Sequence, residues 1–245
     1  MRRAARMARN GKLAEALTSL DQALRLGADP YNCYLRQASL YQSLGQPQEA
    51  VSAAQKAVDL RPDRVAAREA VVALLLELRD FRKAVEASEQ LLRINPRHIA
   101  ARDAMGAAYL GLGDTDAALR IANEVIRREP NQPMHRLKRA FLFEHNGEVR
   151  LAMADLQRAM DMSDDLTLVA TIREHLDALD SSELAKIVEL ASNDAVFRAK
   201  LLREPERTIL ERGFALTDWG LQRLREMAAE GDDTVMPDLP TRLYH

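Results

Sequence analysis

The chain has 245 residues, of which 47% are hydrophobic, 4% aromatic and 29% charged, with a formal net charge of −2. Few aromatic residues disfavour a sheet protein and favour helices packed through Ala and Leu, while the near-neutral charge argues against a general polyanion binder. The single cysteine, Cys33, cannot form an internal disulfide, so we expect a reducing compartment, the cytoplasm. The sequence lacks an apolar run of about 18 residues, and we expect no membrane span.

A period of 34 residues organises the first two thirds of the chain. One register holds glycines, with Arg79 in the slot that lacks one, and a register five positions later holds alanines: Gly11, Gly45, Gly113, Gly147 and Ala16, Ala50, Ala84, Ala118, Ala152. Such a period indicates stacked supersecondary units. We expect each glycine to end a helix in the left-handed conformation, each alanine to allow close helix packing, and Arg79 to strain or reshape its turn.

In chain order, the period predicts five helix–turn–helix units, at residues 1–30, 31–64, 65–98, 99–132 and 133–164. The basic start lacks the apolar stretch of a secretory signal, and we interpret it as the first repeat helix rather than a transit peptide or a nucleic-acid arm. The second unit carries the clearest marks: Ala38, Tyr41, Gly45, Ala50, Ala54, Ala57 and a closing Pro62. These residues resemble the tetratricopeptide repeat. The resemblance implies a right-handed superhelical array of helix-turn-helix repeats, and with the small helical C-terminal domain predicted below the expected fold is all-α.

The pattern changes after residue 164. Residues 165–179 are predicted to form a capping helix, residues 180–230 a small helical domain, and residues 231–245 an extended or disordered tail. Within the domain we expect helices to begin at Ser181, Asp194, Pro205 and Thr217, and one to end at Gly213. Its predicted core is Leu184, Ile187, Val188, Phe197, Leu201, Leu202, Ile209, Leu210, Phe214, Leu216, Trp219 and Leu224.

Residues 193–206 and 211–217 show a phenylalanine-arginine helix, a Leu-Leu-x-x-Pro step and a Gly followed by Leu-Thr-Asp. They are similar to nitrile-hydratase-like leader segments of modified-peptide precursors and to small subunits of aromatic-ring-opening dioxygenases. The resemblance implies a recognition or accessory role, and no catalysis, because the clustered cysteines of the metal motif are absent. The tail carries Val235, Met236, Leu239, Leu243 and Tyr244, which suggests that it docks on a hydrophobic groove, this protein's own included.

The tetratricopeptide resemblance implies a concave groove lined by the first helices. Its expected contact residues are Leu35, Arg36, Ser39, Glu69, Ala73, Leu76, Asp103, Ala107, Leu110, Lys138, Phe141 and His145. The matching positions lack the lysine and asparagine set with which some relatives grip a C-terminal carboxylate. An alanine floor with Glu69 and Asp103 near its centre favours an apolar helix or extended peptide that carries a basic group.

These observations predict a non-catalytic protein–protein interaction adaptor with a protein or peptide partner, no cofactor and no metal. The five histidines lack paired metal-ligand spacing, and no phosphate loop or nucleophile motif is present. One alternative is an accessory subunit or recognition partner of a modifying enzyme, of the peptide-modifying or dioxygenase kind. A less favoured one is nucleic-acid binding through a basic strip: Arg127, Arg128, Arg136, Lys138, Arg139 and Arg150.

Overall fold

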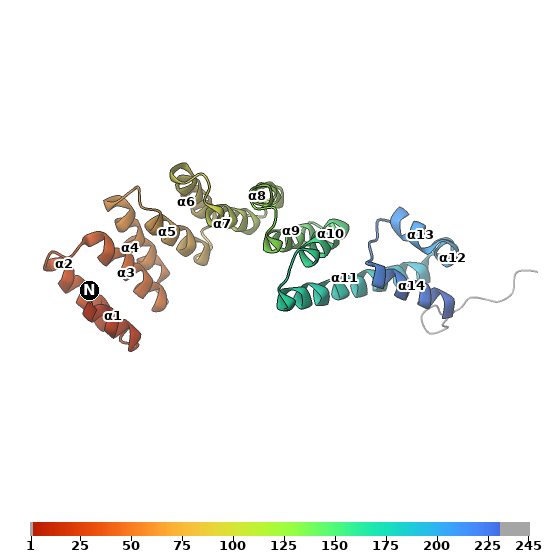
Figure 1. The fold of residues 1–245 in the computed structure, drawn as a ribbon, viewed down its shortest axis with the longest axis horizontal. Helices are drawn as coiled ribbons and strands as arrows, with labels where there is room; N and C mark the ends of the chain where they lie inside the picture. The colour runs from red at the N-terminus through yellow and green to blue at the C-terminus, as the bar shows by residue number, and fades with distance from the viewer. Residues whose placement is uncertain (1, 231–245) are drawn as a thin grey trace, which may run out of the picture. The chain divides into compact units, whose positions relative to one another are not determined.

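A computed structural model describes residues 2–230, and every regular element in that range is an α-helix (Figure 1). The helices are α1 (Arg2–Arg9), α2 (Leu13–Arg25), α3 (Pro30–Ser43), α4 (Pro47–Leu60), α5 (Val65–Glu77), α6 (Phe81–Ile94), α7 (Ile99–Gly111), α8 (Thr115–Arg128), α9 (Pro133–His145), α10 (Val149–Asp161), α11 (Leu166–Asn193), α12 (Ala195–Arg203), α13 (Pro205–Glu211) and α14 (Asp218–Glu230). The all-α prediction is confirmed. The chain divides into two compact units, which we call unit 1 (residues 1–127) and unit 2 (residues 128–245).

The turns of the 34-residue period are built as the glycine register predicts. Gly11, Gly45, Gly113 and Gly147 all have positive φ, between 69° and 79°. After each, the backbone closes a Schellman motif; at Gly45, its N–H donates to Gln42 O and the next N–H donates to Tyr41 O. Arg79 adopts φ 58° in the same motif, so an arginine is held in a conformation that favours glycine.

The alanine register marks the points of closest helix packing. Ala16, Ala50, Ala84, Ala118 and Ala152 are each 0% exposed. The second helices can therefore approach their neighbours closely, since a larger side chain at these positions would overpack the contact. In unit 1 the remaining core is likewise rich in alanine, with Val71, Leu74 and Leu75 filling the space between α4, α5 and α6.

In unit 2, α11 corrects the predicted boundary at residue 180. The helix runs without a break from Leu166 to Asn193, so the cap expected at 165–179 and the first helix of the small domain are one element. Ser181 does not begin a helix; its hydroxyl donates to the Asp177 carbonyl at 2.8 Å from within α11. The first half of α11 packs Ile172 against the core of α9 and α10, whereas its second half packs Ile187 into the C-terminal core.

Two buried acids in the middle of α11 explain why polar residues do not interrupt it. Asp180 is 0% exposed, and its carboxylate accepts the Thr217 backbone N–H at 2.8 Å and the Thr217 hydroxyl. Glu183 is buried beside it and accepts from Lys186 at 2.7 Å and from the Ala215 backbone N–H at 3.4 Å. These bonds fasten the loop before α14 to α11.

The other predicted boundaries of the small domain are confirmed. Asp194 caps α12 by accepting the Phe197 N–H at 2.9 Å, Pro205 is the first residue of α13, Gly213 ends α13 with φ 83°, and Thr217 accepts the Gly220 N–H at 3.2 Å. The predicted core is wrong at three positions that are exposed, Leu202, Leu210 and Trp219, and Val188 lies outside the buried cluster. The predicted tail, 231–245, lies outside the described residues.

Candidate functional site

Three hollows line the first helices of unit 1. The first hollow, about 230 Å³, lies between α1 and α3 and includes Arg36 and Ser39. The second, about 190 Å³, lies between α3 and α5 and includes Leu35, Ser39 and Ala73. The third, about 240 Å³, lies between α5 and α7 and includes Ala73 and Leu76. Ser39 lines the first two hollows and Ala73 the last two, so neighbouring hollows adjoin, and we call the three together the unit-1 groove.

Small side chains make this continuity possible. Ser39 and Ala73 stand 34 residues apart at the junctions between hollows, and both are exposed. Ala107 is exposed at the next position of the same register on α7. A large side chain at a junction would divide the groove, so the serine and alanine keep a continuous floor along which an extended ligand can lie.

The two ends of the unit-1 groove carry opposite charge. Arg36 is exposed and lines the first hollow, where it is the charged residue. The third hollow is lined mostly by Val, Ala and Leu, and its charged residue is Glu69. The groove therefore carries a positive charge at Arg36 on α3, an apolar floor, and a negative charge at Glu69 on α5.

His98 fixes the position of the Glu69 carboxylate. Its Nε2 lies 2.7 Å from Glu69 Oε1, and its Nδ1 accepts the Ala101 backbone N–H at 3.1 Å. Since Nδ1 acts as an acceptor, the ring proton is on Nε2 and is donated to Glu69. The Glu69 side chain remains 47% exposed, so it faces the groove with one oxygen already oriented. The sequence analysis considered histidines only as paired metal ligands and did not predict this role of His98. Its position just before the first residue of α7 could have indicated a capping side chain.

Six of the twelve predicted contact residues line the unit-1 groove: Leu35, Arg36, Ser39, Glu69, Ala73 and Leu76. Three others lie on α7, where Asp103 and Leu110 are half-buried and Ala107 is exposed. On the α7 side, the third hollow is lined by Ala100, Ala101 and Ala104 instead.

The remaining three predicted residues, Lys138, Phe141 and His145, are exposed on α9 in unit 2. There Phe141 is 51% exposed and packs against α11, its ring centroid 5.1 Å from that of His175. His175 Nε2 also lies 3.1 Å from Glu144 Oε2. The face of α9 in unit 2 is thus partly occupied by a residue of α11, 34 positions after Phe141.

The predicted basic strip is partly neutralised. Arg139 forms a bidentate pair with the buried Asp155, at 2.6 and 2.7 Å, and Arg136 lies 3.5 Å from the same carboxylate. Bidentate pairing holds an arginine rigidly. These two arginines therefore have a structural partner, which weakens the nucleic-acid alternative.

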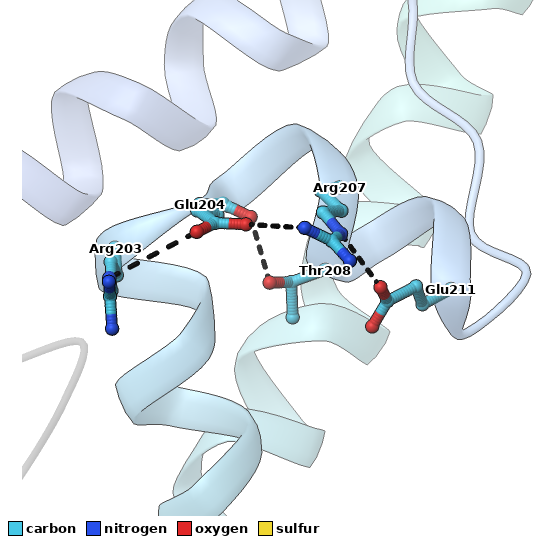
Figure 2. A network of polar contacts seen from close by, with 5 residues as sticks. All are labelled: Arg203, Glu204, Arg207, Thr208 and Glu211. Carbon is cyan, nitrogen blue, oxygen red and sulfur yellow. Dashed lines mark hydrogen bonds and ion pairs between the residues drawn. The ribbon is translucent and has the colours of Figure 1, made fainter.

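Two further hollows are less suited to a ligand. One, about 150 Å³, lies among α4, α5 and α6, where Arg68 donates to the Pro62 carbonyl and to Gln90. The other lies at the α12–α13 junction and is rimmed by charges that pair with one another (Figure 2). There Glu204 lies 4.0 Å from Arg203 and 3.3 Å from Arg207, which also contacts Glu211 at 2.9 Å.

Within residues 2–230, no cluster of three or more His, Cys, Asp or Glu is arranged to hold a metal ion. In the same range, no helix combines the length and apolar character needed to cross a membrane.

The sequence profile of the tetratricopeptide repeat family matches residues 1–165. Solved structures with similar folds include MamA, at 17% identity and a TM-score of 0.58 over 65% of this chain and 93% of that one. MamA 41-end from Desulfovibrio magneticus RS-1 is 22% identical, with a TM-score of 0.58 over 66% and 93%. YrrB, described as a TPR protein with an unusual peptide-binding site, is 19% identical, with a TM-score of 0.55 over 70% and 88%. No curated protein matches the chain.

Proposed function

Because the chain belongs to the tetratricopeptide repeat family, we propose that it is a non-catalytic adaptor that holds a peptide of a partner protein in the unit-1 groove. The observation that carries this proposal is the continuity of the three hollows through Ser39 and Ala73. A ligand of several residues can bury one side chain in each hollow, and burial of apolar area supplies the affinity. A peptide-binding site is also described for YrrB, a protein of the same fold.

The floor of the groove suits an aliphatic ligand better than a charged one. The second hollow is lined by Leu35, Ala38, Ala70 and Leu74 with Ser39 and Gln42 at its edge, and these groups offer little compensation to a buried charge. Charged groups of the ligand would then be recognised at the two ends of the groove, by Arg36 and Glu69.

The test uses the full chain and a random peptide display library. Peptides selected by the wild-type chain should lose binding when Ala73→Trp fills the junction of the second and third hollows. Ala14→Trp is the matched control, because Ala14 is exposed on α2 and lines none of the hollows. Peptides that bind both variants equally would place the binding site elsewhere, and failure to select any peptide would count against peptide recognition itself.

A further inference from the structure

We infer that the third hollow of the unit-1 groove is a lysine-binding subsite, and that the peptide of the partner protein places a lysine side chain in it. The inference rests on the function proposed above and names the chemistry of the ligand. Three observations carry it: the apolar walls of the hollow, the carboxylate that lines it, and the hydrogen bond that already occupies one oxygen of that carboxylate.

The walls of the third hollow suit the aliphatic part of a lysine. Apart from Glu69 and His98, the hollow is lined by valine, leucine and alanine side chains. Val72 and Leu91 are buried, whereas Ala73 is exposed, so the hollow is open to a ligand and apolar inside. Its volume of about 240 Å³ can take up the aliphatic stem of a lysine, and removing that stem from water favours binding.

Glu69 supplies the partner for the lysine ammonium group. The residue lines the hollow, and its side chain is 47% exposed. Its Oε1 accepts the proton of His98 Nε2 at 2.7 Å, which leaves Oε2 to accept from a ligand. Lysine side chains commonly pack the stem on an apolar surface and extend the charged group to its polar edge, and the hollow offers both surfaces.

The hydrogen bond from His98 favours lysine over arginine. A guanidinium binds a carboxylate best through two parallel N–H···O bonds, one to each oxygen. At Glu69 one of the two oxygens already accepts from His98, so a paired contact with arginine competes with that bond. An ammonium group is a compact point charge that does not need the paired geometry, and Oε2 is sufficient for it.

The neighbouring hollows add an aliphatic and an acidic residue to the expected ligand. Helix α5 packs against both α3 and α7, and packed helices lie roughly 8–10 Å apart, so the second and third hollows are separated by about that distance. A polyproline-II peptide presents the same face every three residues, or every ~9 Å. An aliphatic residue three positions from the lysine therefore fills the second hollow, and an acidic residue three positions further on reaches Arg36 in the first.

The peptides selected from the random display library test the ligand chemistry. We expect those whose binding depends on Ala73 to be enriched in lysine, with an aliphatic residue three positions away. One of them is synthesised with its lysine kept or changed to norleucine or arginine, and its affinity for the full chain is measured by fluorescence anisotropy. Norleucine keeps the stem without the charge and should weaken binding about two- to fivefold, as expected for an exposed ion pair. Arginine should also bind more weakly than lysine.

Two substitutions in the chain test the roles of Glu69 and His98. Glu69→Gln should weaken binding of the lysine peptide by the same factor and leave the norleucine peptide unaffected. Glu89→Gln is the matched control, because Glu89 is exposed on α6 and lines none of the three hollows. In His98→Asn the new side chain can still cap α7 but lacks the second ring nitrogen that donates to Glu69. This variant should bind the lysine and arginine peptides more equally.

The outcomes separate this inference from the proposed function. If peptides that depend on Ala73 carry no lysine, or if Glu69→Gln weakens the lysine and norleucine peptides equally, the subsite is wrong while the groove still binds peptides. An unchanged preference for lysine over arginine in His98→Asn would overturn the selection attributed to His98. If the library yields no peptide, the proposed function fails and the lysine subsite fails with it.

Discussion

Replacing Arg79 with glycine should leave unit 1 as stable as the wild type or slightly more stable, although the substitution removes a favourable contact. Arg79 is exposed and stands at φ 58° in the turn between α5 and α6. A non-glycine residue in the left-handed region costs roughly 1–2 kcal/mol. Glycine removes that cost but adds about 0.5–1 kcal/mol of chain entropy in the unfolded state, so the backbone gain is about 0.5–1 kcal/mol.

The side chain offsets part of this gain, and a second variant isolates its share. The Arg79 guanidinium lies 5.7 Å from the centroid of the Phe81 ring, a cation–π contact worth about 0.5 kcal/mol when exposed. Arg79→Ala loses the contact and keeps the strain, so it should destabilise by about 0.5 kcal/mol. The free energy of unfolding of Arg79→Gly should then be about 0.5–1 kcal/mol higher than that of Arg79→Ala. It should equal or slightly exceed that of the wild type.

The two variants are compared by urea unfolding followed by far-UV circular dichroism, with amide hydrogen exchange at the α5–α6 turn as a local readout. Exchange matters because stacked repeats can unfold in parts. A glycine variant no more stable than the alanine variant, by both measurements, would show that the positive φ carries no appreciable strain and would refute the reasoning.

Three other predictions follow from buried contacts and capping. Ser88→Ala should stabilise the chain by about 1 kcal/mol, because the hydroxyl is fully buried without a hydrogen-bond partner. Ala54→Ser, at the equivalent buried position of the preceding unit, should destabilise the chain. The midpoints of urea unfolding of the two variants and the wild type test both predictions. Gly220→Ala places a methyl group 2.5 Å from Asp180 Oδ1 and should lower the stability of the chain by about 1–3 kcal/mol. In Gly106→Ala, the control, the new methyl group meets its nearest atom at 3.5 Å, so this variant should be as stable as the wild type or more stable. Thermal unfolding of both variants tests the difference. The backbone hydrogen bond from Phe197, aided by Arg212, holds the pKa of Asp194 below its ordinary value. The stabilisation of α12 by this carboxylate is therefore complete above the ordinary pKa and is lost as pH falls below about 4, so amide hydrogen exchange in α12 should rise there. Asp194→Asn, which caps the helix without titrating, should not show this rise.

The turns and tight contacts could be predicted from sequence because backbone geometry dictates the residue. A positive φ calls for glycine at Gly45 or Gly113, and a fully buried helix crossing calls for alanine at Ala50. Both signals are local and repeat every 34 residues, so they reinforce one another. The conformation of Arg79 was predictable for the same reason, since its place in the series determines the turn.

The incorrect predictions have a different physical cause. Each concerns a feature that depends on contacts between residues far apart in sequence. The break predicted at residue 180, with a helix beginning at Ser181, was wrong because the partners that bury Asp180 and Glu183 within α11, Thr217 and Ala215, lie more than thirty positions away. Leu210 was placed in a core on hydrophobicity alone, although the short α13 buries Ile209 instead. The groove could be predicted along α3 and α5, where its residues repeat, but the contribution of His98 depended on a cap and on Glu69 in another helix.

The continuity of α11 changes how the C-terminal helices relate to the last helix pair. At about 1.5 Å per residue, its 28 residues form a rod of ~42 Å, and each half belongs to a different core. Ile172 and Leu176 are buried with α9 and α10, while Leu184 and Ile187 are buried with α12 and α13. The C-terminal core therefore cannot reorient relative to α9 and α10 without bending a helix at Asp180, where the carboxylate also secures the α14 cap. The surface of α12–α14 is thus held at a fixed position relative to α9 and α10.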